Sequence, residues 1–211
     1  MLMTEYDRRD ERRSTANGRS ALPCSGFTLV ELIVVVSIAA ILLSIAVPSY
    51  QSSVTKYRIS TEVNGLVGDL QYARSEAIKQ GIPVTVCVTA DNLTCSGATT
   101  WSTGRIVLVN PLDPVANAGS VLRMAAPFSG TDTAAPAPTV TSISFNRDGF
   151  AGVPSAASWN GFTSLTAAVV VTVWDQARTT GLESCVVISQ IGQISVLASG
   201  AALPAPLAGN C

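Results

Sequence analysis

Glu31 is the only charged residue in the apolar run of residues 27–47, and it lies about one helical turn from the start of that run. An ionised carboxylate in a membrane segment costs on the order of 2.5 to 3.5 kcal/mol at the bilayer centre and less near an end, so it requires a partner or a function. One structural explanation is a capping box, in which Thr28 and Glu31 satisfy the first amides of a helix whose positive end also favours the carboxylate. The sequence therefore predicts a helix that begins beside Thr28 and carries a carboxylate in its first turn.

The apolar run is long enough to cross a membrane. Its length of about 21 residues spans roughly 30 Å as an α-helix, which matches the thickness of a hydrocarbon core. The preceding segment is polar and contains arginines at Arg8, Arg9, Arg12, Arg13 and Arg19. Because basic residues favour the cytoplasmic side, we expect a single-pass protein with a cytoplasmic N-terminus and an exported C-terminal part.

The residues Gly26-Phe27-Thr28-Leu29-Val30-Glu31, followed by this apolar segment, resemble the class III signal of type IV pilins and type II secretion pseudopilins. The resemblance implies that a prepilin peptidase cuts between Gly26 and Phe27, and that the new N-terminal Phe27 is methylated. It also implies that Glu31 is needed for assembly with other pilins or pseudopilins. Cleavage would place a cationic amine at the positive end of a helix dipole, and Glu31 of the same or a neighbouring subunit would compensate it.

This resemblance also implies a location. The protein would reside in the bacterial inner membrane, with its globular domain in the periplasm, before it enters a pilus or pseudopilus.

Residue types that support catalysis or metal binding are scarce. The chain has no histidine, which removes the commonest general base and metal ligand. The sequence has no paired carboxylates, nucleophile elbow or phosphate loop, and no C-x-x-C pair that would indicate zinc. We therefore expect no enzyme activity, no metal site and no cofactor.

The charge balance argues against general nucleic-acid binding. Of the 13 basic and 14 acidic residues, five and four lie in residues 1–26, so cleavage leaves a net charge of about −2. That value is not the electrostatic footprint of a nucleic-acid-binding domain.

The five cysteines are Cys24, Cys87, Cys95, Cys185 and Cys211. Cleavage after Gly26 removes Cys24 and leaves four, an even number in a chain predicted to face an oxidising compartment. Three disulfide connectivities are possible. The favoured one joins Cys87 to Cys95 across a short loop between strand ends, and Cys185 to Cys211 across the C-terminal tail.

Beyond Pro48 the sequence becomes amphipathic. Apolar residues recur at three- and four-residue steps at Ile59, Val63, Leu66, Leu70, Ala73, Ala77 and Ile78. Pro48 is expected to kink the helix without ending it, whereas Gly81 and Pro83 are expected to end it. Arg74 and Glu76 are expected to be solvated helix charges.

From residue 83 onward, short β-rich runs alternate with turn residues. Strands are expected at residues 83–89, 105–110, 120–126, 139–145, 167–174, 184–189 and 193–197. Turns are expected at residues 147–149 and 190–192, and surface loops at 127–138 and 151–163.

These elements predict an α+β fold, in which a long N-terminal spine helix packs on antiparallel β-sheets. The expected ranges are a cleaved leader at 1–26, a membrane-spanning and assembly half of the helix at 27–48, an amphipathic half at 49–81, a β-rich globular domain at 82–197 and a C-terminal tail at 198–211.

Further segments are similar to signatures of the GspH/FimT family of minor pilins and pseudopilins, namely residues 69–84, 101–107, 145–149 and 185–189. This resemblance implies a minor pilin near the tip of a type IV pilus, or a minor pseudopilin of a type II secretion system. In the FimT branch a Gly-Arg motif contacts DNA phosphate, so a DNA-binding pilin for DNA uptake is the alternative function of another class. Here Gln193 follows Gly192, which argues against DNA as a partner, and no DNA-binding residue is predicted. Trp101 and Trp174 are expected to anchor the core or loops, and Asp148 to shape a turn.

Overall fold

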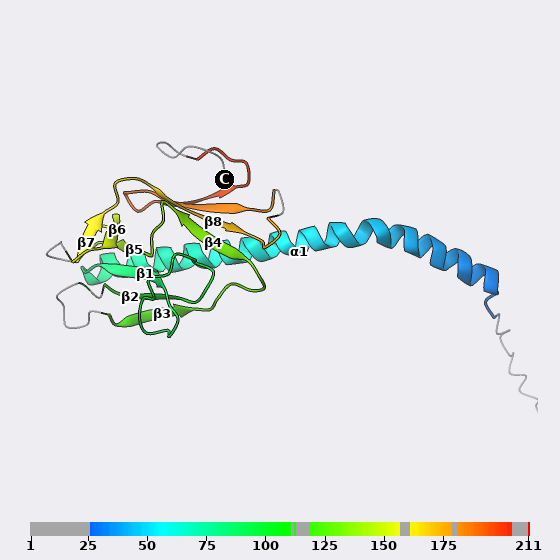
Figure 1. Cartoon of the computed structure of the whole chain (residues 1–211), viewed down its shortest axis with the longest axis horizontal. Helices are drawn as coiled ribbons and strands as arrows, with labels where there is room; N and C mark the ends of the chain where they lie inside the picture. The colour runs from blue at the N-terminus through cyan, green and yellow to red at the C-terminus, as the bar shows by residue number, and fades with distance from the viewer. Residues whose placement is uncertain (1–25, 111, 113–118, 157–160, 179–180, 204–210) are drawn as a thin grey trace, which may run out of the picture. The chain divides into compact units, whose positions relative to one another are not determined.

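The computed structural model describes residues 26–110, 112, 119–156, 161–178, 181–203 and 211. Within this part of the chain, one α-helix precedes ten β-strands (Figure 1). By its internal contacts the chain divides into two units, Met1–Ala46 and Val47–Cys211. The leader predicted for residues 1–26, including Cys24, lies outside the described residues except for Gly26.

Helix α1 spans Leu29–Gln80, and its assigned helical conformation continues through Pro48. It starts directly after Thr28, as the capping pattern predicts. It stops at Gly81, whose φ of 72° is a left-handed conformation that glycine adopts without a steric penalty. The Gly81 amide still donates to the Ala77 carbonyl oxygen at 2.9 Å, which satisfies one of the last free carbonyls of the helix.

The predicted amphipathic stripe of α1 is buried with one exception. Ile59, Val63, Leu66, Leu70, Ala73 and Ala77 are all buried, and they pack against both β-sheets. Ile78 was predicted to belong to this stripe, but it is exposed. It lies about 100° around the helix from Ala77, at the margin of the buried face.

The strands form two antiparallel sheets. The six-stranded sheet has the order β3 (Val121–Ala125), β2 (Arg105–Val109), β1 (Val84–Val88), β5 (Ser142–Phe145), β6 (Ala151–Pro154) and β7 (Phe162–Ser164). The four-stranded sheet has the order β10 (Ile194–Ala198), β9 (Ser184–Ile188), β8 (Val169–Trp174) and β4 (Thr133–Ala137).

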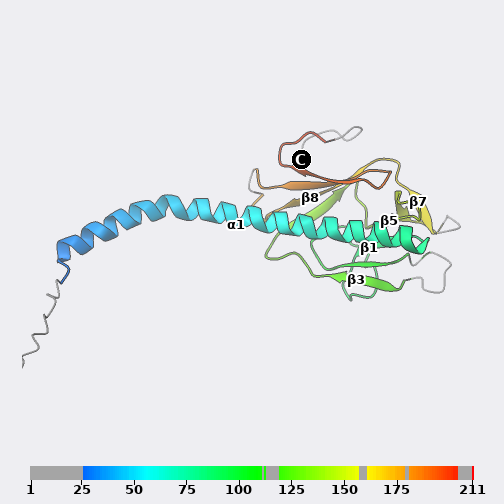
Figure 2. The same cartoon turned by 180° about the vertical axis from the view of Figure 1, so that it is seen from behind.

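The main core lies between α1 and the two sheets. Inward-facing residues of β1 and β5 meet the helix from one sheet, and those of β8 and β9 meet it from the other. Both sheets lie on the same side of the part of α1 that belongs to the domain, so the opposite face of that part is uncovered (Figure 2). The predicted spine helix on antiparallel sheets is therefore the observed architecture.

Three strands lie in segments that the sequence predicts as surface loops, and that prediction was wrong there. Strand β4 consists of Thr133, three alanines and Pro136. It pairs only with β8 at a sheet edge, where a missing N–H is tolerated. Strands β6 and β7 are short and pair with each other. A side chain at Gly152 would collide with the Thr163 carbonyl and the Phe162 ring, so the close pairing of β6 with β7 requires glycine there.

The remaining strand and turn predictions are confirmed to within three residues at each end. Both predicted turns are closed by glycine amides at 2.9 Å, from Gly149 to the Asn146 carbonyl oxygen and from Gly192 to the Ser189 carbonyl oxygen. Asp148 lies in the first of these turns, where its amide donates to Asn146 Oδ1 at 3.0 Å.

Candidate functional site

Gly26, Phe27 and Glu31 are exposed at the start of α1. Thr28 caps the helix, because its Oγ1 accepts a hydrogen bond from the Glu31 amide at 3.2 Å and its carbonyl oxygen accepts one from the Leu32 amide at 3.1 Å. A side chain at Gly26 would meet no atom within 4 Å. The bond between Gly26 and Phe27 is therefore accessible, and the Glu31 carboxylate lies in the first helical turn beyond it.

The first part of α1 has no buried side. Every residue from 26 to 54 is exposed, including the apolar residues of the predicted membrane segment. Among the described residues, α1 is the helix whose length and composition allow it to cross a membrane. An apolar surface on all sides of a helix requires lipid or other apolar helices around it.

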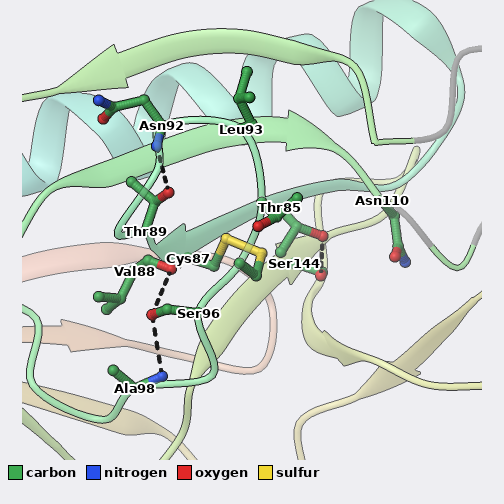
Figure 3. Close-up of a disulfide and its surroundings, with 12 residues drawn as sticks. Thr85, Cys87, Val88, Thr89, Asn92, Leu93, Ser96, Ala98, Asn110 and Ser144 are labelled. Carbon is green, nitrogen blue, oxygen red and sulfur yellow. Dashed lines mark hydrogen bonds between the residues drawn. A yellow bond between two sulfur atoms is a disulfide. The ribbon is translucent and has the colours of Figure 1, made fainter.

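The structure joins Cys87 to Cys95 and Cys185 to Cys211, which is the pairing that the sequence favours. The first disulfide closes a loop after β1 (Figure 3). Within this loop Asp91 accepts hydrogen bonds from the amides of Leu93 and Thr94 at 2.9 and 2.8 Å. These backbone hydrogen bonds, from Thr94 first, hold the pKa of Asp91 well below its usual value. The loop is thus shaped by a covalent closure and by an ionised carboxylate.

The second disulfide secures the end of the chain to the outer face of the four-stranded sheet. Cys211 is buried with Val170 and Val187, and Leu203 packs against the same cluster. The Cys211 amide donates to the Ala201 carbonyl oxygen at 2.9 Å. The predicted low-propensity tail thus has a packed end, while its residues 204–210 lie outside the described residues.

A buried ionic cluster that the sequence did not predict connects α1 to the six-stranded sheet. Asp69 on α1 and Arg105 on β2 are both buried, with Arg105 Nη2 at 3.2 Å from Asp69 Oδ2. Arg123 on β3 approaches the other oxygen, with its Nε at 3.2 Å from Asp69 Oδ1. Within the described residues, Oδ1 accepts no hydrogen bond, so its interaction with Arg123 is purely ionic.

Arg105 is enclosed by further partners. Its Nη1 donates to the Trp101 carbonyl oxygen at 3.2 Å, and its guanidinium lies 4.7 Å from the centroid of the Phe128 ring. Trp101 is fully buried, which confirms its predicted role as a core anchor. Because the carboxylate of Asp69 supplies the nearest opposite charge, the buried guanidinium depends on it.

Two further contacts connect α1 to the segment between β3 and β4. Arg58 binds Asp132 through two parallel hydrogen bonds, of 2.6 Å from Nε and 2.7 Å from Nη2, and this hydrogen bonding raises the pKa of Arg58. Glu62 accepts hydrogen bonds from both the amide and the hydroxyl of Ser129 at 2.7 Å.

The sequence contains a signal for the ionic and hydrogen-bonded contacts of α1. Arg58, Glu62 and Asp69 recur at steps of four and seven residues, so they share the flank of α1 beside the buried stripe. Charges in such a row more often face solvent, and only the position of the strands shows that they are paired.

The prediction that Arg74 is a solvated helix charge was wrong. It is partly buried, and it donates from Nε to the Gly149 carbonyl oxygen at 3.1 Å and from Nη2 to the Ile191 carbonyl oxygen at 3.4 Å. Glu76 is also partly buried and accepts hydrogen bonds from Lys79 and Gln80. Arg74 therefore connects the last turns of α1 to both predicted β-turns.

The long helix on two antiparallel sheets, with an exposed apolar first half, defines a pilin-like protein. The family model for type II transport protein GspH matches residues 62–192, and the model for the prokaryotic N-terminal methylation motif matches residues 23–47. This chain belongs to the GspH family of minor pilins and pseudopilins. The methylation motif includes Gly26, Phe27 and Glu31.

Among solved structures, two crystal forms of the type IV minor pilin FimU from Pseudomonas aeruginosa are similar in fold. They give TM-scores of 0.45 and 0.44 at 22% and 23% sequence identity, over 66% of this chain and 85% and 90% of the FimU chains. No curated protein sequence matches this chain.

Proposed function

We propose that this chain is a minor pilin, a structural and not a catalytic subunit that is incorporated near the tip of a type IV pilus. In this proposal a prepilin peptidase removes residues 1–26, Phe27 becomes the methylated N-terminus, and the globular domain faces the periplasm before assembly. Other pilins then surround the apolar half of α1 that lipid surrounds beforehand.

The observation that carries the proposal is the position of Glu31. It is the one charge in a helical segment whose apolar residues are all exposed, and it lies within one turn of the proposed new terminus. In a low-dielectric surrounding a carboxylate attracts a nearby ammonium group strongly. Glu31 is therefore suited to neutralise the amine of Phe27 in a neighbouring subunit while the apolar side chains pack around both groups.

The test separates processing from assembly. Glu31→Val removes the charge and keeps an apolar, helix-compatible side chain, so the variant should be cleaved and methylated at Phe27 but should be missing from filaments. Mass spectrometry of the mature N-terminus measures the first property, and immunoblotting of sheared filaments measures the second. Glu31→Asp is the matched control that keeps the charge. Normal recovery of Glu31→Val with filaments would refute the assembly role.

The second candidate is a minor pseudopilin of a type II secretion system. The observation in its favour is that the matched family model bears the name of a type II transport protein. The two candidates differ in location: a pilin is recovered in filaments sheared from the cell surface, whereas deletion of a pseudopilin stops secretion of folded proteins and leaves surface pili intact. A secretion defect with normal piliation would favour the second candidate.

A further inference from the structure

The two cysteines of the first disulfide lie in different surroundings. Cys87 belongs to β1, which pairs with β2 on one side and with β5 on the other, and its side chain is fully buried. Cys95 belongs to the loop after β1, where it is half-buried between the exposed residues Thr94 and Ser96. One cysteine is therefore fixed inside a sheet, whereas the other lies at the surface of the domain.

The surroundings of Cys87 are apolar. Ile106 and Leu108 of β2 are buried beside it, and Val121 packs against the same cluster. The nucleophile in thiol–disulfide exchange is the thiolate, which forms less readily from a thiol in apolar surroundings. An oxidising disulfide that approaches from solution therefore meets Cys95 before Cys87.

Hydrogen bonds hold the loop over β1 independently of the disulfide. The amide of Ser96 donates to the Val88 carbonyl oxygen at 2.9 Å, and the Ser96 hydroxyl donates to the same oxygen at 3.2 Å (Figure 3). The hydrogen bonds to Asp91 shape the residues in between. Because Val88 and Ser96 directly follow the two cysteines, these bonds keep Cys95 beside Cys87 and keep Cys87 covered when both are thiols.

We propose that Cys95 is the entry cysteine and Cys87 the resolving cysteine in the oxidation of this pair by a dithiol–disulfide oxidant. In the first step the Cys95 thiolate attacks the disulfide of the oxidant, a mixed disulfide forms, and one oxidant thiolate leaves. In the second step Cys87 loses its proton and attacks the Cys95 sulfur, so that the disulfide of the chain forms and the second oxidant thiolate leaves. Two thiols of the chain are oxidised, and the oxidant disulfide takes up two electrons and two protons to become a dithiol.

The second step is intramolecular and joins two sulfur atoms that the loop already holds together, so it should be fast. The mixed disulfide is therefore transient in the unsubstituted protein and accumulates only when the resolving thiol is missing. This maturation reaction goes beyond the proposed function and is independent of it, because it concerns the domain before any assembly.

Trapping of the mixed disulfide tests the order of the two steps. The full chain is reduced in detergent and treated with an excess of oxidised glutathione, and peptide mass spectrometry then locates glutathione on individual cysteines. Cys87→Ala lacks the resolving thiol, so glutathione should accumulate on Cys95. Cys95→Ala is the matched variant, in which Cys87 should be modified on the order of tenfold more slowly. No glutathione on Cys95 in the first variant, or faster modification of Cys87 in the second, would overturn the proposal.

The same reaction in concentrated guanidinium chloride separates burial from local sequence. Both cysteines should then react at similar rates, because the denatured chain no longer covers Cys87. A tenfold difference that persists in the denaturant would show that the fold does not set the order, and would overturn the proposal.

The unsubstituted protein gives a test that does not depend on the folding of either variant. Limiting iodoacetamide is added to the reduced full chain, and the labelled cysteines are identified by peptide mass spectrometry. Cys95 should be alkylated on the order of tenfold faster than Cys87, because the same difference in access controls both reactions. Equal labelling of the two cysteines, or earlier labelling of Cys87, would overturn the proposal and leave the pilus role untouched.

Discussion

Residues 29–46 and residues 47–80 of α1 share one backbone conformation and differ in what their side chains meet. In the first part the apolar side chains are exposed on every side of the helix. In the second part a stripe from Ile59 to Ala77 is buried against two sheets, and charges on its flank are paired with the strands. The two parts of the helix therefore have different roles. The apolar side chains of the first part must be covered by other molecules, whereas those of the second part are covered by the sheets of the same chain.

This difference gives the carboxylates Glu31 and Asp69 different roles. Glu31 is exposed and has no part in the domain core, whereas Asp69 is buried between Arg105 and Arg123. Matched substitutions at these two positions test whether the two roles are separate.

The largest effect is expected for Asp69→Ala, because it leaves the buried Arg105 guanidinium without its carboxylate. Removal of one partner of a buried ion pair destabilises by about 3 to 5 kcal/mol. The free energy of unfolding is measured on the full chain in detergent by denaturant titration, with the fluorescence of buried Trp101 as a reporter. Glu31→Val is the control and should leave this free energy unchanged. A similar loss in both variants would contradict the separation of roles.

The next effect concerns apolar packing. Leu70→Ala removes a fully buried side chain from the stripe, which should cost about 2 to 5 kcal/mol through lost burial and the cavity that remains. Leu42→Ala makes the same change in the exposed part and should leave the unfolding of the domain unaltered. The same denaturant titration measures both variants. Equal unfolding midpoints would show that the buried stripe does not stabilise the domain.

A smaller effect is expected for Arg74→Ala. It removes two hydrogen bonds from a charged donor to the turn carbonyls, and partial solvent access limits the cost to about 1 to 2 kcal/mol. Amide hydrogen exchange of residues 147–150 and 190–192 should accelerate, because both turns lose their connection to the helix. Arg147→Ala, which changes an exposed arginine in one of these turns, should leave the exchange at 190–192 unaffected.

The smallest effect concerns Glu76 in the last turns of α1. Hydrogen bonds from Gln80 first and then Lys79 lower the pKa of Glu76 below its usual value of 4.5. Because the pKa is lower in the folded state, the stabilisation is complete above about pH 4.5 and is lost as the pH falls further. Glu76→Gln should therefore lower stability by about 0.2 to 0.5 kcal/mol at pH 7, and the difference from the unsubstituted protein should shrink as the pH falls below about 4.5. A difference independent of pH would contradict this explanation.

Much of the fold could be predicted because its signals are local. The apolar run, the change to a 3.6-residue period after Pro48, and the stop at Gly81 depend on residues close in the chain. The disulfide pairing favoured from loop lengths is also the observed pairing. Strands β4 and β6 escaped prediction because alanine, glycine and proline carry no strand signal of their own. Strand β7 escaped prediction because its three residues are too short a run to show a strand pattern, and it becomes a strand only through pairing with β6.

The residue types and spacing around Gly26, Phe27 and Glu31 were sufficient to match the N-terminal methylation motif, because that motif depends only on residues close together in the chain. Only the tertiary structure shows which charged residues of α1 bind other parts of the domain. In the sequence, Asp69, Arg58 and Arg74 have the spacing of solvated helix charges, and only the strands and turns beside them show that they have partners within the domain. Contacts between distant segments depend on the packing of the whole domain, and no local pattern specifies them.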